Sequence, residues 1–246
     1  MKTKIQQTFL LFLIAFNGLA KLPEKVIILT FDDAIASQST NTAKILNEYG
    51  FGATFFVCEF PPNFDTDKEN YMTWEQIKEL SDMGFEIGNH TRTHVNITKI
   101  SDDSLISELE YIDSKCRKYN IEVPSTFAYP GYSNDSLSIN VLRQKKYWYA
   151  RAGGGRPYNI EKDDPFLLPS YDIAGTDTSK VYRAIRTASQ GNVVILTIHG
   201  VPDNVHPWVN TPPELFKEYM DYLKKNNYTV WSLKTLHDNL YSNLNR

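Results

Sequence analysis

The chain reads Val26-Ile27-Ile28-Leu29-Thr30-Phe31-Asp32-Asp33 over its first strongly patterned stretch. The opening residues are apolar and mostly β-branched, which is typical of a parallel strand that is buried on both faces. Such a strand cannot bury two neighbouring carboxylates unpaired, so we expect Asp32 and Asp33 at its carboxyl end, where α/β folds place their sites. Because side chains alternate along a strand, the two carboxylates should point in different directions. One can then bind a metal while the other faces a water molecule.

A second group of polar residues follows another short strand. That strand spans residues 85–89, and His90 and His94 come after it, four positions apart. One carboxylate and two neutral imidazoles make a three-ligand set, which leaves positions open for water and substrate, as catalytic sites do. Taken alone, two histidines at this spacing also fit the surface of a helix. The paired aspartates upstream and a third histidine, His199, after another apolar strand favour the metal site.

These motifs together resemble those of the polysaccharide deacetylase family, also called the NodB homology or carbohydrate esterase 4 family. The resemblance runs from about Val26 to Leu236, and Thr30-Phe31-Asp32-Asp33-Ala34 stands where the family pattern is Thr-Phe-Asp-Asp-Gly. It implies a metal-dependent hydrolase that acts on a carbon–nitrogen bond other than a peptide bond, or on a carbohydrate ester.

The resemblance also implies roles for individual residues. The late family element Leu-x-x-His is similar to Leu196-Thr197-Ile198-His199. The bound metal is expected to be Zn²⁺, and Co²⁺, Ni²⁺ or Fe²⁺ suits the same ligands. The implied roles are general base for Asp32, metal ligand for Asp33, His90 and His94, and general acid for His199.

The third family motif departs from its usual form. It commonly reads Arg-Pro-Pro-Tyr, whereas Phe127-Ala128-Tyr129-Pro130-Gly131-Tyr132 has alanine where the arginine would stand. In the family that arginine pairs with the catalytic aspartate. We predict that Arg151, at the end of the next strand, pairs with Asp32 instead and keeps it ionised; a solvated surface arginine is the alternative. The fourth motif, Asp-x-x-Asp-Trp, is not recognisable, and Asp172 is the candidate for orienting His199.

Three residues are expected to contact the substrate. Backbone N–H groups near Gly131 would stabilise a tetrahedral oxyanion. Tyr132 and Trp208 lie in loops expected over the site, and their aromatic faces suit sugar rings; an anchor packed under the barrel rim is the alternative for Trp208. The predicted substrate is an acetylated carbohydrate, either an N-acetyl amino sugar polymer or an O-acetylated polysaccharide. The alternatives are a hydrolase of another non-peptide amide and a glycan-binding protein with a degenerate site.

Short apolar strands alternate with helical stretches along the chain, which indicates a parallel sheet. A chain of 246 residues is long enough for one α/β barrel. We therefore predict a distorted or incomplete (β/α) barrel of about seven parallel strands, formed by a single catalytic domain over residues 21–246. The expected strands are 26–29, 52–58, 85–89, 126–129, 147–150, 193–198 and 228–231, and the expected helices are 41–49, 73–83, 101–119 and 214–225.

Composition and the first residues limit the location and the partners. There are 26 Lys and Arg against 29 Asp and Glu, so no basic surface indicates nucleic acid. Lysines, a short apolar run and small residues over positions 1–20 predict a secretory signal, hence a secreted or periplasmic protein with no stable membrane span after cleavage. For Cys58 and Cys116, buried free thiols are favoured over a disulfide.

Overall fold

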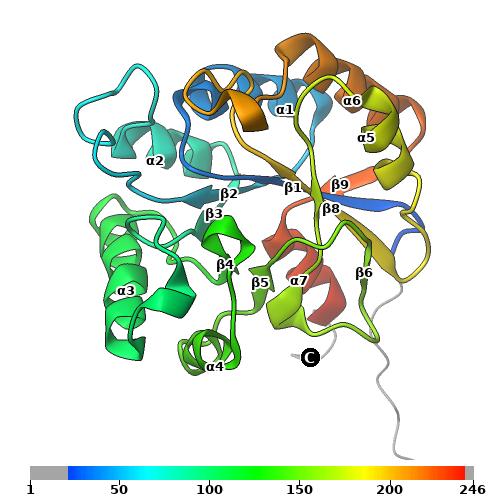
Figure 1. Ribbon diagram of the computed structural model, residues 1–246. Coiled ribbons are helices and arrows are strands. Elements are labelled where there is room, and N and C mark those ends of the chain that lie inside the picture. The colour runs from blue at the N-terminus through cyan, green and yellow to red at the C-terminus, as the bar shows by residue number, and fades with distance from the viewer. Residues whose placement is uncertain (1–21, 242–246) are drawn as a thin grey trace, which may run out of the picture.

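β1 (Val26–Phe31) lies at the centre of the sheet in the computed structural model of the protein, which describes residues 22–241 (Figure 1). All of its residues are buried, as its apolar sequence predicts. On one side it pairs in parallel with β8 (Asn192–Ile198). On the other side its first half pairs with β9 (Thr229–Trp231) and its second half with β2 (Thr54–Val57). The carboxyl end of β1 is therefore flanked by the ends of β2 and β8.

Three further parallel strands extend the sheet beyond β2. These are β3 (Glu86–Asn89), β4 (Thr126–Ala128) and β5 (Tyr149–Arg151), in that order. Each strand was predicted within a few residues of its observed position. Their shared direction brings their carboxyl ends to the same edge as the end of β1.

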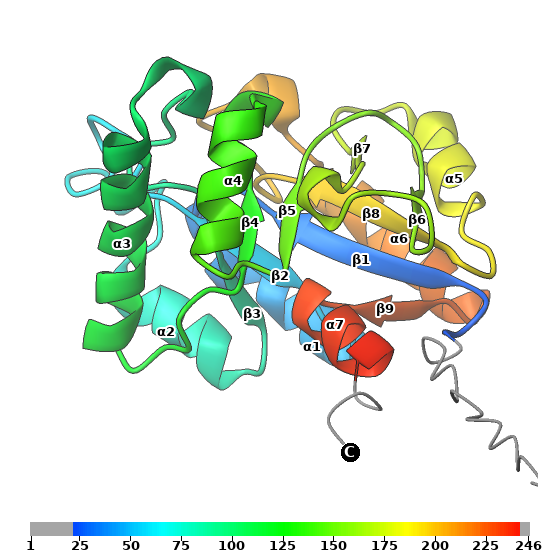
Figure 2. The same ribbon diagram turned by 90° about the horizontal axis from the view of Figure 1, so that it is seen from below.

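The strand pairing then continues around towards β8. A parallel bridge joins Arg151 to Leu168, in the segment that leads into β7 (Tyr171–Asp172), and β7 pairs in parallel with β8. The fold is thus the predicted distorted (β/α) barrel (Figure 2). The two-residue strands β6 (Tyr158–Asn159) and β7 were not predicted, and β6 is antiparallel to β8, which makes the sheet mixed.

Helices lie outside the strands. Thr73 and Gln76, which have capping-box spacing in the sequence, form a capping box, and Ser101 caps the next helix through its side chain. The helices α6 (Pro213–Lys225) and α7 (Leu233–Tyr241) pack beside β9 and β1 (Figures 1 and 2). The helices are α1 (Ala43–Tyr49), α2 (Trp74–Asp82), α3 (Asp102–Lys118), α4 (Ser136–Gln144), α5 (Thr178–Ile185), α6 (Pro213–Lys225) and α7 (Leu233–Tyr241).

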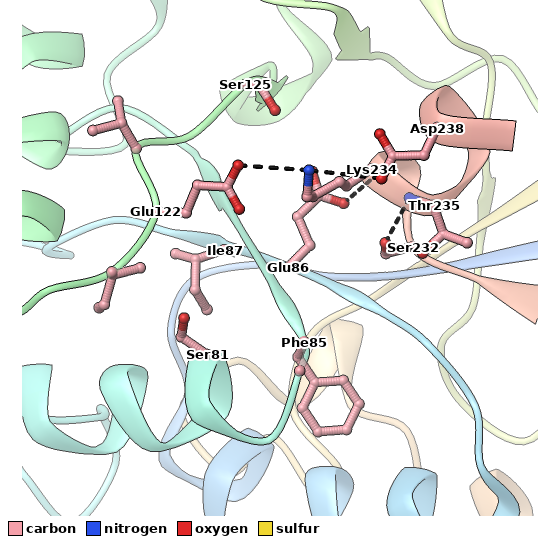
Figure 3. A pocket seen from close by; sticks show the side chains of 13 residues that line it. Ser81, Phe85, Glu86, Ile87, Glu122, Ser125, Ser232, Lys234, Thr235 and Asp238 are labelled. Carbon is pink, nitrogen blue, oxygen red and sulfur yellow. Dashed lines mark hydrogen bonds and ion pairs between the residues drawn. The ribbon is translucent and has the colours of Figure 1, made fainter. Parts of the chain in front are cut away.

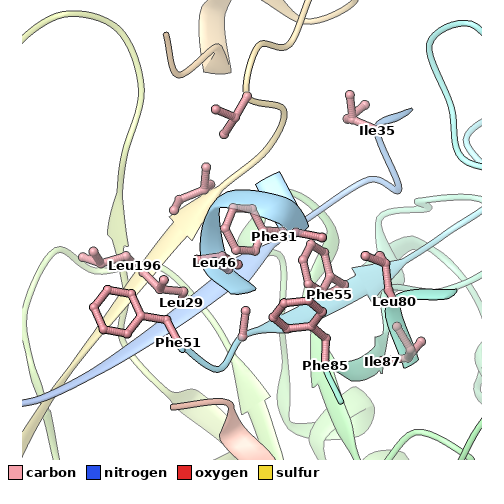
Figure 4. Close-up of a cluster of buried hydrophobic side chains, with 14 of the residues drawn as sticks. Leu29, Phe31, Ile35, Leu46, Phe51, Phe55, Leu80, Phe85, Ile87 and Leu196 are labelled. Atoms are coloured by element: carbon pink, nitrogen blue, oxygen red, sulfur yellow. The ribbon is translucent and has the colours of Figure 1, made fainter. Parts of the chain in front are cut away.

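The largest apolar cluster joins the strands to the helices around them (Figure 4). Phe31 of β1 stacks on Phe55 of β2 with ring centroids 4.9 Å apart, and Phe55 meets the edge of Phe85 at 5.4 Å. Leu46 of α1 and Leu80 of α2 pack into the same cluster. Full burial of one such side chain contributes about 1.5–3 kcal/mol, so this cluster is a main source of stability and holds β1 in place.

A buried carboxyl group occupies the end of β3 opposite His90 (Figure 3). Glu86 accepts hydrogen bonds from Thr54 Oγ1 at 2.8 Å, Thr126 Oγ1 at 2.6 Å and the backbone N–H of Lys234 at 2.7 Å. Burial raises the pKa of Glu86, and the hydrogen bonds oppose that shift. A cavity of about 250 Å³ adjoins it. These hydrogen bonds give Glu86 a structural role, connecting β2, β3, β4 and α7.

Several predictions about location fall partly outside this structure. The predicted signal, residues 1–20, lies outside the described residues. Across residues 22–241, no helix combines the length and the apolar character that a bilayer crossing requires. Cys58 and Cys116 are both buried free thiols, as the sequence favoured.

Candidate metal and acid–base site

The carboxyl ends of the strands surround one open cavity of about 360 Å³. Among the residues expected to act in the site, only Arg151 does not line it. The cavity also has three aromatic or imidazole side chains to which the sequence analysis assigned no role there: Phe60, Tyr129 and His206. The lining residues predicted from the sequence are Asp32, Asp33, His90, His94, Gly131, Tyr132, Asp172, His199 and Trp208.

Asp33, His90 and His94 form a cluster with the spacing of metal ligands. Asp33 Oδ1 lies 3.4 Å from His90 Nε2 and 3.5 Å from His94 Nε2, and one donor atom from each residue lies within 4.8 Å of the others. Donor atoms each about 2.1 Å from a tetrahedral centre are roughly 3.4 Å apart, so these separations suit one shared ion better than direct hydrogen bonds. The three residues fit a small divalent cation.

The orientation of His90 supports this arrangement. Its Nδ1 lies 2.8 Å from the backbone oxygen of Ala128. Donation from Nδ1–H to that carbonyl leaves Nε2 without a proton and directed at Asp33, which is the usual outer support of a metal-binding histidine. The alanine that replaces the family's arginine therefore contributes through its backbone.

The ionisable groups of this cluster shift one another's pKa values. Burial would raise the pKa of Asp33, but the neighbouring imidazoles of His90, His199 and His94 lower it far below its usual range. Burial lowers the pKa of His94 to about 4, and the charge of His90 adds to this effect. For His90 burial acts in the same direction, yet Asp32 and Asp33 outweigh it and raise its pKa. A cation would displace the proton that these carboxylates attract to His90.

Asp32 occupies a different environment from Asp33. Its Oδ2 accepts a hydrogen bond of 2.5 Å from Arg151 Nη2, while Arg151 Nη1 donates to Thr197 Oγ1 at 2.8 Å. The Arg151 side chain is 0% exposed, which excludes the surface alternative. Asp32 Oδ1 is buried and has no hydrogen-bond partner among the described residues. One oxygen is thus held by a cation, and the other remains able to accept a proton.

His199 reaches the same group from β8. Its Nε2 lies 3.7 Å from Asp33 Oδ2, on the other carboxylate oxygen from His90 and His94. Its Nδ1 is buried and has no partner among the described residues. The prediction that Asp172 orients His199 is wrong, because the half-exposed Asp172 carboxylate lies 3.7 Å from Lys180 of α5 instead.

A family model described as polysaccharide deacetylase matches residues 20–150, more than half of the chain. The chain belongs to this family. The match contains Asp32, Asp33, His90 and His94, and it stops before Arg151.

Curated relatives of this polysaccharide deacetylase chain are similar over part of their length. A peptidoglycan-N-acetylglucosamine deacetylase from Bacillus cereus is 34% identical over 118 residues, which are 46% of this chain and 50% of the relative. A bifunctional xylanase/deacetylase from Pseudobutyrivibrio xylanivorans is 25% identical over 228 residues, 85% of this chain and 33% of the relative. The matched part of the chain spans half or less of these proteins.

Solved structures share the fold. The Xyl-CE4 domain of a multidomain xylanase from the hindgut metagenome of Trinervitermes trinervoides superposes with a TM-score of 0.61 at 20% identity, covering 91% of this chain and 92% of that one. A family 4 carbohydrate esterase pseudoenzyme from Bacillus anthracis gives 0.61 at 17% identity, covering 88% and 66%. At these identities the likeness concerns the fold alone.

The loops above the deacetylase fold hold the expected substrate-contacting residues. Tyr132 and Trp208 are 36% and 73% exposed, so the alternative of a packed anchor for Trp208 is wrong. The Tyr132 N–H already donates to the Tyr129 carbonyl at 2.9 Å. An oxyanion donor from this loop would therefore be the N–H of Gly131.

Unusual backbone conformations concentrate at the site. Asp33, Ala34, Thr91, His94 and Tyr132 all have positive φ, between 52° and 72°. Such angles are uncommon for residues other than glycine, and they occur where the surrounding structure fixes the chain for a functional purpose. The angle of 55° at Ala34 also explains why a glycine at this position suits the family pattern.

Two supporting groups were missed from the sequence. The buried Gln38 amide donates to the backbone carbonyls of both Asp32 and His199, which ties the ends of β1 and β8 together. Ser170 lies 2.8 Å from Thr197, which in turn accepts from Arg151. Thr197 interrupts an apolar strand and could have been singled out for that reason, whereas Gln38 and Ser170 carry no such signal.

Proposed function

We propose that the protein is a metal-dependent deacetylase that hydrolyses acetyl groups on a glycan. The observation that carries this proposal is the separation of roles around two adjacent carboxylates. Asp33 points at His90 and His94, while Asp32 is held by Arg151 with one oxygen unpaired. A site that only bound glycans would not need both arrangements.

Each residue of the site is suited to a different role in hydrolysis. A divalent cation held by Asp33, His90 and His94, most simply Zn²⁺, would polarise the acetyl carbonyl and lower the pKa of an adjacent water. Asp32 Oδ1 takes the proton of the attacking water, and Arg151 holds Asp32 in place through its Oδ2 atom. The Gly131 N–H faces the oxyanion, and His199 protonates the departing amine or alcohol.

The substrate is proposed to be an N-acetyl amino sugar polymer or an O-acetylated polysaccharide. The B. cereus relative is named for peptidoglycan N-acetylglucosamine and the P. xylanivorans relative for xylanase and deacetylase activities. Both substrate types present an acetyl group beside sugar rings, which the open, aromatic-edged cavity suits. Action on an extracellular polymer also agrees with the predicted export.

The test is acetate release from acetylated chitooligosaccharides, acetylxylan and peptidoglycan, with Zn²⁺, Co²⁺, Ni²⁺ or Fe²⁺ added to metal-free protein. We expect release from at least one substrate, and loss of it in His94→Ala. Asp82→Asn, which changes an exposed carboxylate on α2, is the control and should be fully active. Folded wild-type protein that releases no acetate from any of the three with any of these metals would refute the proposal.

A further inference from the structure

The loop between β8 and α6 carries a second histidine–carboxylate pair beside the same cavity. His206 Nδ1 lies 3.4 Å from Asp203 Oδ2. Neither atom has another partner among the described residues, and the Asp203 side chain is fully buried. Asp203 and burial act in opposite directions on the pKa of His206, and the effect of Asp203 is the larger, so the pKa is raised. The Nδ1 edge of the ring therefore faces the Asp203 carboxylate at ion-pair distance, without the geometry of a hydrogen bond.

The loop is organised around the Asp203 carboxylate. Asp203 Oδ1 accepts hydrogen bonds from the backbone N–H groups of Val205 at 3.1 Å and His206 at 2.7 Å. The Asp203 N–H donates to Asn210 Oδ1 at 2.8 Å. A side chain at Gly200 would place its Cβ 2.7 Å from Asp203 Cα, so the turn accepts only glycine there. Asp203 therefore positions His206 through the backbone of the loop.

His206 presents its other edge to the cavity. It is one of the residues that line the cavity, and its Nδ1 edge is buried against Asp203. The Nε2 edge is the one left to meet a ligand. The Phe60 ring contacts both His94 and His206, with centroid separations of 4.8 Å and 5.2 Å. The cluster of donor atoms that converge as metal ligands contains Asp33, His90 and His94 and does not include His206.

Trp208 stands next to this histidine. Their ring centroids are 5.4 Å apart, and Trp208 follows Pro207 in a short 3₁₀ turn (Pro207–Val209). An indole that is 73% exposed leaves a large apolar face in water, which marks a binding surface when a polar group converges beside it. A sugar ring has this mixed character, with an apolar C–H face and hydroxyl groups at its edge.

We propose that His206, oriented by Asp203, and Trp208 form a second sugar subsite that binds the pyranose unit next to the acetylated one. The Trp208 indole stacks on the C–H face of that unit, and His206 Nε2 hydrogen-bonds one of its hydroxyl groups. The subsite rests on the proposed deacetylase function and adds to it a requirement for an oligomeric substrate. His206 is a binding residue that takes no part in the chemical step.

The test compares substrates of different length in His206→Ala, His206→Gln, Trp208→Ala and Trp208→Phe. Three acetylated tetramers are compared first: chitotetraose, xylotetraose and a peptidoglycan tetrasaccharide. The one that wild-type protein deacetylates fastest is then the probe. We expect both alanine variants to raise KM for the tetramer about tenfold, because each loses one hydrogen bond or stacking contact. The rise in KM for the acetylated monosaccharide should be smaller. The glutamine and phenylalanine variants should recover part of the loss. Asn204→Ala, an exposed change on the same loop, is the control.

Binding is measured separately by calorimetry with the same tetramer in an Asp32→Asn background, where turnover does not interfere. Kd should rise with KM. Because Trp208 is exposed, Trp208→Ala decides the outcome if His206→Ala fails to fold. Active wild-type protein whose alanine variants keep the tetramer KM and Kd would overturn the subsite alone. Inactive wild-type protein would overturn the deacetylase proposal. Calorimetry would then be run with all three tetramers, and binding of any of them that depends on Trp208 would support the subsite by itself.

Discussion

Replacing Arg151 by Met should destabilise the metal-free protein strongly. The substitution keeps an unbranched apolar stem but removes the cation that donates to Asp32 at 2.5 Å and to Thr197 at 2.8 Å. Both Arg151 and Asp32 are buried. Breaking a buried ion pair from one side costs about 3–5 kcal/mol, because the remaining charge is left uncompensated. For a domain of this size that corresponds to a fall in Tm of about 6–20 °C.

The measurement is calorimetric melting of protein treated with a chelator, with Arg156→Ala as the matched control. Arg156 pairs with Asp163 at the surface, and such pairs are worth at most about 1 kcal/mol, or up to about 4 °C in Tm. The two expected ranges do not overlap. Adding zinc should reduce the Arg151→Met loss, because a bound cation also neutralises the site. A Tm within 4 °C of wild type would refute the buried pair.

Two further predictions concern the ligand cluster. Asp32→Asn should keep zinc while its turnover falls about 10²–10⁴-fold, whereas Asp33→Asn should lose zinc. Elemental analysis measures the zinc content, and an equal loss of zinc in both variants would make Asp32 a ligand. Metal-free protein should lose up to about 3 kcal/mol of stability as pH falls from 6.5 to 4, because the unfolded chain protonates His94 there and the folded chain, with its pKa lowered to about 4, does not. His90 has a raised pKa, so it opposes this loss only at the top of the window, where the unfolded chain is still partly deprotonated. Urea unfolding of His94→Gln should show a flatter pH dependence.

Much of the fold was predictable because strong local patterns agree with the tertiary structure. The apolar run of β1 indicated a strand buried on both faces, and the Thr73 capping box indicated the start of α2. The strands β6 and β7 were missed because two residues carry no periodicity, and their pairing depends on β8, far along the chain. Local sequence cannot report such partners.

The candidate site was predictable to the extent that it follows strand ends. Asp33, His90 and His94 converge because each follows or nearly follows a parallel strand, and Arg151 meets Asp32 across the barrel for the same reason. Asp172 failed as a partner for His199: its half-exposed carboxylate lies 3.7 Å from Lys180 of α5 instead. The direction of a side chain on a two-residue strand depends on such neighbours, and sequence does not specify it.

The positive φ angles around the cavity have a consequence for engineering this protein. Thr91 carries a β-branched side chain at φ 61°, next to a proposed ligand, so a glycine or asparagine there would relax the backbone. A selection for thermal stability would therefore favour the substitution of Thr91 by glycine or asparagine. A selection for turnover would reject it, because the relaxed loop would hold His90 and His94 less firmly. Screening both traits at once would keep residues such as Thr91 as they are and direct improvement to the outer helices, where rigidity and chemistry do not compete.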